Sequence, residues 1–567
     1  MNLLEELWIP IHRRTGQVGW IAPHQITEPD IVAFAANRAD FNGALAQMMI
    51  GLLQTTTPIN DEGEWEGLLD APPTAEVLQK WFAATAEAFV LDGDGARFMQ
   101  DFSLTATEGA ECTVDALLID AAGGSAIDKS TDHFVKRDTI KAMCPYCLAT
   151  ALFTLQTNAP AGGAGHRTSL RGGGPLTTLL VATPSRSLWQ DLWLNVKPQR
   201  TFLQQGGDTK KTAKHFTFPW LAEISKIQPA GGETQPLQVH PHHVFWAMPR
   251  RIRVDFADVQ IGQCDVCKRD STQLLHRYAT KPQGLNYKGV WRHPFSPYYE
   301  TKEGWLPVHP QPGGFSYKNW LAWVLGVKQG KKSVQAAGIV DYFLQERKKY
   351  QASGQFRLWV FGYDMDNMKP RCWYETTFPL YGLAEANRAT QTQIQNQNIQ
   401  FGHQFNELAN LLQLVEGRFN TVQTLSEQLH ALEANLLQNP LQQERLEQIL
   451  GQLKYLKELH HSLQNKASII EIKLQTDFQK RLQALQEQFQ QVQTHLNAHK
   501  AEAKQSDTHL QERFQEELSQ LQSRFNDFNE SSQTKTTQLE EQLQKNIEQL
   551  QHSLSHYQEQ GMQVDTH

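Results

Sequence analysis

The sequence predicts an α+β protein, with an irregular mixed globular domain at residues 1–385 and a long α-helical coiled coil at residues 386–567. Three observations lead to this prediction. Short apolar runs bounded by Pro, Gly and Asn alternate with segments of helical periodicity before residue 385. Two Cys-x-x-Cys pairs in the same part predict a zinc-knuckle-like site. After residue 385 the composition shifts to Gln, Glu and Leu, without tryptophan and with few glycines.

The globular part contains both kinds of periodicity. Apolar residues at helical spacing predict helices near three segments, 31–34, 44–52 and 77–82. Continuous apolar runs between turn residues predict strands at three others, 177–181, 244–248 and 358–361. Most tryptophans between residues 189 and 323 are expected in the core, as large aromatic side chains usually are.

The two cysteine pairs are Cys144-Pro-Tyr-Cys147 and Cys264-Asp-Val-Cys267. Four thiolates in two such turns suit a tetrahedral structural zinc, because each turn supplies two sulfurs to one side of the metal. One zinc ion on Cys144, Cys147, Cys264 and Cys267 would close a very long loop. The glycine-rich run at 162–174 follows the first pair and would be held next to it.

Other readings of these cysteines remain open. Cys-Pro-Tyr-Cys before an apolar run is also typical of the redox motif of glutaredoxins, in which Cys144 would be the nucleophile and Cys147 the resolving thiol. The cysteines could also lack any special role. A disulfide is disfavoured, because residues 1–7 lack the basic region and apolar core of a signal peptide. With no apolar run of about 18 residues, a cytoplasmic protein is expected.

The charge is distributed unevenly along the chain. The whole sequence has a net charge of −7, whereas residues 161–360 hold 27 Lys and Arg against 12 Asp and Glu, a net charge of +15. A basic region within an acidic protein is typical of phosphate binding. The alternative is a basic face that is merely solvated. No nucleophile–base pair and no paired carboxylates stand out, so no catalytic residue is assigned.

The region after residue 385 shows coiled-coil spacing. Apolar residues step by four and three in two runs, Leu408, Leu412, Val415, Phe419 and Val422, and then Phe478, Leu482, Leu485, Phe489, Val492 and Leu496. Pro440 interrupts the pattern and predicts a break near Asn439. Because the apolar seam must be buried, an antiparallel fold-back or a multimer is expected rather than a lone helix.

Five further motifs lie at Met1–Pro10, Asp132–Arg137, Gly165–Gly173, Trp291–Pro297 and Gly362–Lys369. Found in this order, they make the first 380 residues similar to CasA, the large subunit of the type I-E CRISPR surveillance complex called Cascade. The resemblance implies a non-catalytic subunit that recognises the protospacer-adjacent motif in duplex DNA while a guide RNA reads the remaining target sequence. It implies as partners the other Cascade subunits, CRISPR RNA and double-stranded target DNA.

The resemblance also implies which residues face DNA. A first loop would carry the stacking aromatic Phe134, with Lys136 beside it, and a minor-groove lysine would fall at Lys281. The family's glycine loop corresponds to Ala161, Gly162, Gly163, Ala164 and Gly165, and its strand-separating hairpin to Asp366, Asn367, Met368 and Lys369. Glycine suits a loop that probes the minor groove, which is only about 6 Å wide.

The chain departs from the family in two places. Ala164 stands where another loop glycine is expected. The Gln-rich coiled coil takes the place of the family's C-terminal four-helix bundle, which puts the recruitment of the helicase-nuclease in question. Two other functions stay open: a zinc-binding coiled-coil scaffold or tether, and a thiol-disulfide oxidoreductase using Cys144 and Cys147.

Overall fold

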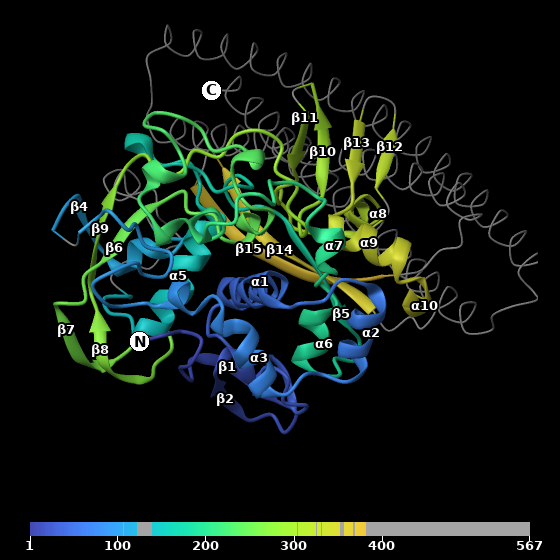
Figure 1. The fold of residues 1–567 in the computed structure, drawn as a ribbon, viewed down its shortest axis with the longest axis horizontal. Helices are drawn as coiled ribbons and strands as arrows, with labels where there is room; N and C mark the ends of the chain where they lie inside the picture. The colour runs from blue at the N-terminus through green and yellow to red at the C-terminus, as the bar shows by residue number, and fades with distance from the viewer. Residues whose placement is uncertain are drawn as a thin grey trace, which may run out of the picture. The chain divides into compact units, whose positions relative to one another are not determined.

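The computed structural model describes residues 1–380, apart from 106, 122–138, 303, 325, 330–331, 352–355 and 367–368 (Figure 1). The mixed α and β content of this part agrees with the predicted fold class. The predicted coiled coil and the domain boundary near residue 385 lie outside the described residues and stay predictions.

Short helices surround one long central helix. The α-helices are α1 (Ala39–Thr56), α2 (Glu62–Asp70), α3 (Ala75–Ala83), α5 (Pro145–Asn158), α6 (Leu188–Trp193), α7 (Gln199–Phe202), α8 (Tyr317–Val324), α9 (Gly338–Glu346) and α10 (Lys348–Gln351). Within the described ranges, none of the helices combines the length and the apolar character needed to span a membrane.

The strands form several small antiparallel sheets. They are β1 (Ile9–Arg13), β2 (Val18–Ile21), β3 (Ile31–Phe34), β4 (Ala110–Thr113), β5 (Thr177–Ala182), β6 (Arg251–Val254), β7 (Val259–Gln263), β8 (Asp270–Leu275), β9 (Arg277–Lys281), β10 (Tyr298–Thr301), β11 (Gly304–Pro307), β12 (Val327–Gln329), β13 (Lys332–Gln335), β14 (Phe356–Asp366) and β15 (Lys369–Pro379). The sheet orders are β2-β1-β3, β11-β10-β13-β12, β15-β14-β5, β4-β9-β6 and β7-β8.

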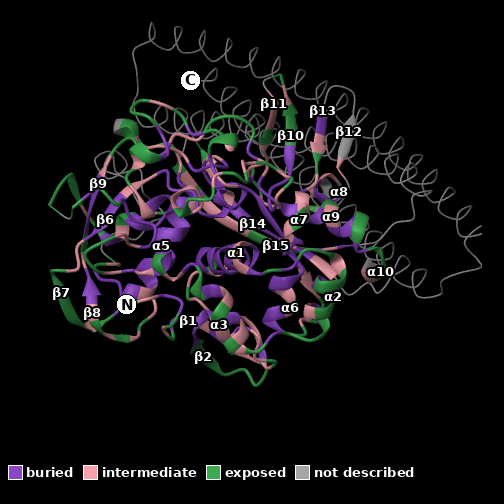
Figure 2. Cartoon of the chain, viewed as in Figure 1, coloured by how far each residue is buried: buried purple, intermediate pink, exposed green. Residues whose placement is uncertain are grey.

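Helix α1 forms the centre of the core. It is apolar on almost every side, and Figure 2 shows it buried along most of its length. Two glycines let neighbours approach its backbone. A Cβ on Gly43 would lie 2.8 Å from the Phe361 ring of β14, and one on Gly51 would lie 3.0 Å from Phe245. This packing explains why α1 lies close to β14 (Figure 1).

The sheet β15-β14-β5 confirms two predicted strands. Leu358 of β14 pairs with Leu180 of β5, and both side chains are fully buried. On its other edge, β14 pairs with β15 along most of its length, ending at Asp366 opposite Lys369. The two strands therefore form one long antiparallel hairpin.

Two predicted elements are wrong. Residues 31–34, predicted as helix, form β3, because pairing with β1 and the buried side chains of Ile31 and Phe34 favour a strand. Residues 244–248, predicted as a strand, form no strand: Val244 and Phe245 end the 3₁₀ helix Pro241–Phe245, and residues 246–248 have no regular structure. A short, fully buried apolar run does not distinguish strand from helix, and Pro241 sets the start of this turn.

Candidate metal centre and nucleic-acid interface

The first cysteine pair lies at the start of α5. Cys144 is the N-cap residue, Pro145 occupies the first helical position, and the Cys147 amide donates to the Cys144 sulfur at 3.5 Å. Pro is favoured at this position because its missing N–H would have no partner in the first turn. The helix start therefore presents both sulfurs on one side.

The second pair occupies the turn between β7 and β8. The Lys268 amide donates to the Cys264 carbonyl at 2.9 Å, and the Cys264 amide donates to the Arg269 carbonyl at 2.8 Å. Lys268 has a φ of +62°, a left-handed conformation that closes the turn tightly. This turn folds Cys264 and Cys267 towards the same side.

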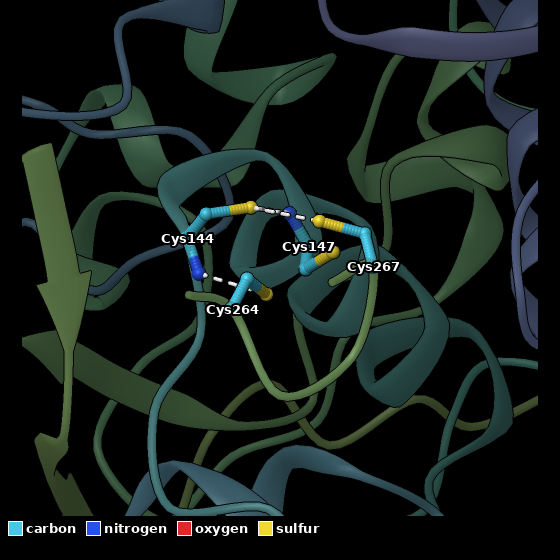
Figure 3. Close-up of side chains that lie close together, drawn as sticks. All are labelled: Cys144, Cys147, Cys264 and Cys267. Atoms are coloured by element: carbon cyan, nitrogen blue, oxygen red, sulfur yellow. Dashed lines mark hydrogen bonds between the residues drawn. The ribbon is translucent and has the colours of Figure 1, made fainter. Parts of the chain in front are cut away.

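The two pairs meet, as predicted (Figure 3). The Cys144 amide donates to the Cys264 sulfur at 3.2 Å, and the sulfurs of Cys144 and Cys267 lie 3.7 Å apart. The four sulfur atoms all lie within 4.8 Å of one another. A tetrahedral zinc with bonds of about 2.3 Å places its sulfur ligands roughly 3.8 Å apart, so this donor set fits zinc.

Neighbouring residues hold the two pairs together. The Asp265 carboxylate accepts from the amides of Lys141 and Ala142 at 2.7 and 2.8 Å. Met143 and Leu275 exchange backbone hydrogen bonds. The hydrogen bond with the Cys144 thiol, and in second place that with the Cys147 thiol, lowers the pKa of Cys267 to about 7. The hydrogen bond with Cys144 raises the pKa of Cys147 instead, so the thiolate that a metal needs is favoured at Cys267 and not at Cys147.

The geometry disfavours the two thiol alternatives. A sulfur separation of 3.7 Å between Cys144 and Cys267 is much longer than a disulfide bond of about 2.05 Å. Cys144 is 3% exposed and Cys147 8% exposed, whereas a redox dithiol needs an accessible nucleophile. Convergence of four sulfurs is also more than a two-cysteine redox motif requires.

The predicted glycine loop follows α5 and closes on itself. The amides of Ser169 and Gly174 donate to the carbonyls of Ala159 and Asn158 at 2.9 and 3.0 Å. The loop tip at Gly163–Gly165 is one turn of 3₁₀ helix. A Cβ on Gly163 would meet no described atom within 4 Å, while Gly165 has a φ of +83°. The tip is therefore open at Gly163 and needs glycine at Gly165 for its backbone.

Lys281 lies next to this loop. The Gln283 amide donates to the Gly165 carbonyl at 3.1 Å, and a Cβ on Gly165 would lie 3.6 Å from the Pro282 side chain. Lys281 itself ends β9, opposite Arg251 of β6, and its ammonium lies 3.6 Å from the Glu108 carboxylate. The structure thus brings together two segments that were assigned separately to the DNA-facing surface.

The third predicted segment is the hairpin end. A Cβ on Gly174 would lie 2.7 Å from the Tyr363 carbonyl and 2.9 Å from the Met365 side chain, so β14 packs on the base of the glycine-rich run. Arg371 pairs with Asp364 at 2.7 Å and lies 3.6 Å from Asp366, which braces the strand ends. The predicted contacts Phe134, Lys136, Asn367 and Met368 lie outside the described residues.

Arg250 belongs to this region and was not predicted. Its guanidinium donates to the Pro160 carbonyl, and its Nη1 lies 3.0 Å from where a Gly162 Cβ would be. Gln156 holds the Arg250 backbone through two hydrogen bonds of 2.9 Å. Burial lowers the pKa of Arg250 to about 10. Only its position within the basic segment could have drawn attention to it, because its contacts come from distant residues.

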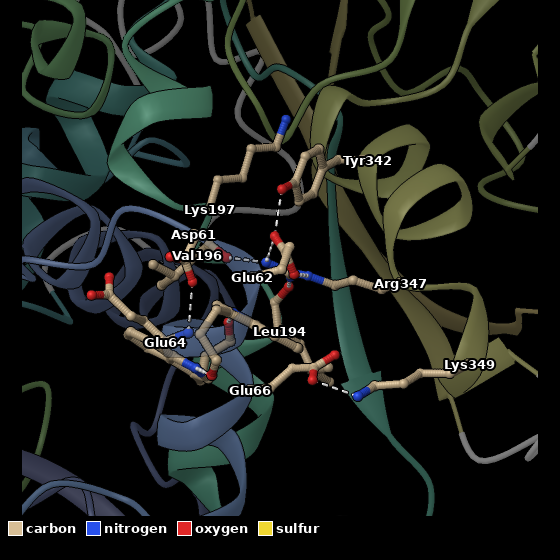
Figure 4. Close-up of polar contacts among 12 residues, drawn as sticks. Asp61, Glu62, Glu64, Glu66, Leu194, Val196, Lys197, Tyr342, Arg347 and Lys349 are labelled. Atoms are coloured by element: carbon tan, nitrogen blue, oxygen red, sulfur yellow. Dashed lines mark hydrogen bonds and ion pairs between the residues drawn. The ribbon is translucent and has the colours of Figure 1, made fainter.

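A buried charge network was also missed (Figure 4). Arg347, 1% exposed, donates to the Glu62 carboxylate at 3.0 Å and to the carbonyls of Leu194 and Val196 at 2.9 Å. Lys197 donates to the Gly338 carbonyl at 2.7 Å. Burial, and then the positive charge of Arg347, lower the pKa of Lys197 to about 7. The network ties α2 to α9.

Comparison with known proteins identifies a family match over most of the chain. A family model described as CRISPR-associated protein Cse1 matches residues 2–405. That range includes all four clustered cysteines and every residue assigned to the DNA-facing surface.

Solved structures share this fold. CasA (Cse1) of Thermus thermophilus has a TM-score of 0.53 at 14% identity, covering 72% of this chain and 82% of that one. Cse1 of Thermobifida fusca has a TM-score of 0.50 at 12% identity, covering 66% and 72%. A chain from a CRISPR RNA-guided surveillance complex has a TM-score of 0.51 at 14% identity, covering 72% and 82%. At these identities the likeness establishes the fold.

Proposed function

This chain belongs to the CRISPR-associated Cse1 family, and on that premise we propose that it is the large subunit of an RNA-guided, Cascade-type surveillance complex. In this role it inspects duplex DNA for a short adjacent motif and helps to open the target, while the guide RNA reads the remaining sequence. Its partners are then the other subunits of the complex, the CRISPR RNA and double-stranded DNA.

One observation carries the proposal beyond family membership. The hydrogen bond from the Gln283 amide to the Gly165 carbonyl joins the glycine loop to the segment of Lys281. These two segments are far apart in sequence, and the family resemblance assigns both to the DNA-facing surface. Their contact supports a single reading surface made of an open glycine backbone and the chain segment that follows Lys281.

The chemistry of these groups suits the minor groove. The groove is narrow, so a backbone without side chains at Gly163 can approach the base edges. Lys281 can neutralise a phosphate or donate to acceptors on the bases. The hairpin strands β14 and β15 pair as far as Asp366 and Lys369, and the two residues between them in sequence, Asn367 and Met368, are proposed to wedge between base pairs.

The four cysteines are proposed to bind one structural zinc ion. Cys144 and Cys147 hold it from α5, and Cys264 and Cys267 from the turn between β7 and β8. The metal supplies cross-linking and no reaction chemistry, because four protein ligands leave no open coordination position. We assign no catalytic residue to this subunit. Recruitment of a helicase-nuclease is a further proposal that depends on the region after residue 385.

Binding of the assembled complex to duplexes with randomised flanking bases tests the proposed function. Affinity is expected to depend on the bases beside the target, with several related motifs tolerated, because the minor-groove code is degenerate. If duplexes with different bases beside the target bind with equal affinity, the proposal that this subunit inspects the adjacent motif is wrong. Thiol-disulfide exchange activity that is lost in Cys144→Ser would instead support the oxidoreductase alternative.

A further inference from the structure

Arg171 is a buried cation with only neutral partners. Its side chain is 3% exposed, and it donates to the hydroxyls of Thr177 and Ser296 at 3.1 Å and to the side-chain oxygen of Gln47. No carboxylate pairs with it in the described part of the chain. Burial lowers the pKa of Arg171 only to about 10, so it stays charged at neutral pH. A buried charge without an opposite charge is costly.

A small cavity lies beside Arg171. Its volume is about 20 Å³, enough for one water-sized species, which needs roughly 10–15 Å³. The end of α5 and the chain that returns from the glycine loop contribute to its wall, and no Asp or Glu takes part in the lining. The polar lining residues are Gln47, Gln156, Thr157, Ser169, Arg171 and His293.

His293 adds a second donor to the same cavity. Its Nδ1 accepts from the Phe295 amide at 3.2 Å, which places the ring proton on Nε2. Nε2 has no hydrogen-bond partner among the described residues, although the side chain is only 5% exposed. Arg171 and His293 therefore line one space that no carboxylate lines.

We propose that this cavity binds a small monovalent anion of halide size between Arg171 and His293. A water molecule could accept from His293, but it would leave the charge of Arg171 uncompensated, whereas a halide satisfies both groups. The space beside the two groups takes a water-sized species, and a halide is the anion closest to that size. The site is independent of the proposed DNA-inspecting role, although it lies at the base of the glycine loop. Ser169, another lining residue, also closes that base through its bond to Ala159.

Thermal unfolding of the full chain tests the site. At constant pH and ionic strength, replacing gluconate by chloride or bromide is expected to raise Tm in proportion to the logarithm of halide concentration, because an anion that binds only the folded state stabilises it. Arg171→Gln is expected to lose this dependence. Arg13→Gln, which removes a surface ion pair with Glu28 and Asp30, is the matched control and should keep it.

Two further measurements apply if Arg171→Gln does not fold. His293→Asn, which keeps Arg171 and an acceptor for the Phe295 amide, should weaken the halide dependence. Crystals grown with bromide should show an anomalous peak within hydrogen-bond distance of the Arg171 guanidinium. The proposal is overturned if halide and gluconate give the same Tm in the unmodified chain, or if bromide gives no such peak and the cavity holds water alone.

Discussion

The backbone amide of Cys144 donates to the sulfur of Cys264 at 3.2 Å, although 120 positions separate the two residues. The bond places the second cysteine pair against the start of α5. Purified protein is expected to contain about one equivalent of zinc per chain, measured by elemental analysis. Less than about half an equivalent in freshly purified protein would rule out a four-cysteine zinc site.

Cys264→Ser should release the metal and lower the free energy of unfolding by several kcal/mol, because metal binding and folding are coupled. Loss of DNA binding is then expected to follow from unfolding. Cys112→Ser and Cys372→Ser are matched controls, since both cysteines lie outside the cluster and neither forms a disulfide. Both should retain zinc, and loss of zinc from either would contradict the ligand assignment.

Lys281→Ala is expected to weaken DNA binding with little effect on stability. Its contact with Glu108 is a partly exposed pair at 3.6 Å, worth at most about 1 kcal/mol. If Lys281 contacts a phosphate, the slope of log affinity against log salt should decrease by about one. If it reads base edges, the slope should hold while discrimination between motifs weakens.

Lys214→Ala is the control for Lys281. Lys214 forms an exposed pair with Glu87 at 2.6 Å and lies outside the proposed reading surface. Its replacement should leave motif discrimination and salt slope unchanged. An unchanged slope and unchanged discrimination in Lys281→Ala would exclude Lys281 from the interface.

Gly163→Ala separates close approach by DNA from folding of the loop. A Cβ there meets no described atom within 4 Å, so the free energy of unfolding should change no more than for a neutral surface substitution, about 0.5 kcal/mol. DNA affinity should nevertheless fall by about tenfold, or about 1.4 kcal/mol, because the new methyl group faces the groove. Gly95→Ala, also in open space, is the control.

Gly162→Ala should behave differently, because its Cβ would lie 2.9 Å from His166 and 3.0 Å from Arg250. That change should disturb the loop even without DNA, as a shift in the amide NMR signals or proteolysis of the loop would show. Normal DNA affinity in Gly163→Ala would mean that the glycine loop does not reach the groove.

The lowered pKa of Lys197, about 7 in the folded protein, makes stability depend on pH. Between about pH 7 and 10.5 the unfolded chain holds a proton on this lysine that the folded chain has released, so stability should rise with pH in that window. The slope cannot exceed about 1.4 kcal/mol per pH unit for one proton.

Chemical denaturation of Lys197→Met across this pH range should show a flatter profile. Lys349→Met is the control, because Lys349 lies on the surface in a pair with Glu66 and its pKa is raised. A rise with pH that persists unchanged in Lys197→Met would assign the titration to another group.

A chain ending at Glu385 is expected to fold and to keep its zinc, because β15 ends at Pro379 and all four cysteines precede it. It should fail to join a complete surveillance complex if the predicted coiled coil has taken over subunit docking. If this shortened chain assembles normally, residues 386–567 are not needed for subunit docking. Failure to fold would place the domain boundary elsewhere.

Local patterns predicted local features well. The strands at 177–181 and 358–361 and the helices at 44–52 and 77–82 are present, because each run matches the burial that its element provides. The cysteine spacing predicted that four sulfurs would converge. The strand at 31–34 was missed, because only pairing with β1 decides its conformation. Arg250 and Arg171 could not be found, since their importance arises from contacts with residues far away in the sequence.

The separation of the two cysteine pairs has a consequence for the order of assembly. Loop closure costs only about 0.6 kcal/mol more for each doubling of length, but such distant contacts form slowly. During synthesis Cys144 and Cys147 emerge first and offer a metal only half its ligands. Complete coordination waits until β7 and β8 have paired and brought Cys264 and Cys267 into place. The newly made chain should therefore become able to hold zinc tightly only late in folding. The rate of zinc uptake would then report the rate at which the two cysteine pairs come together.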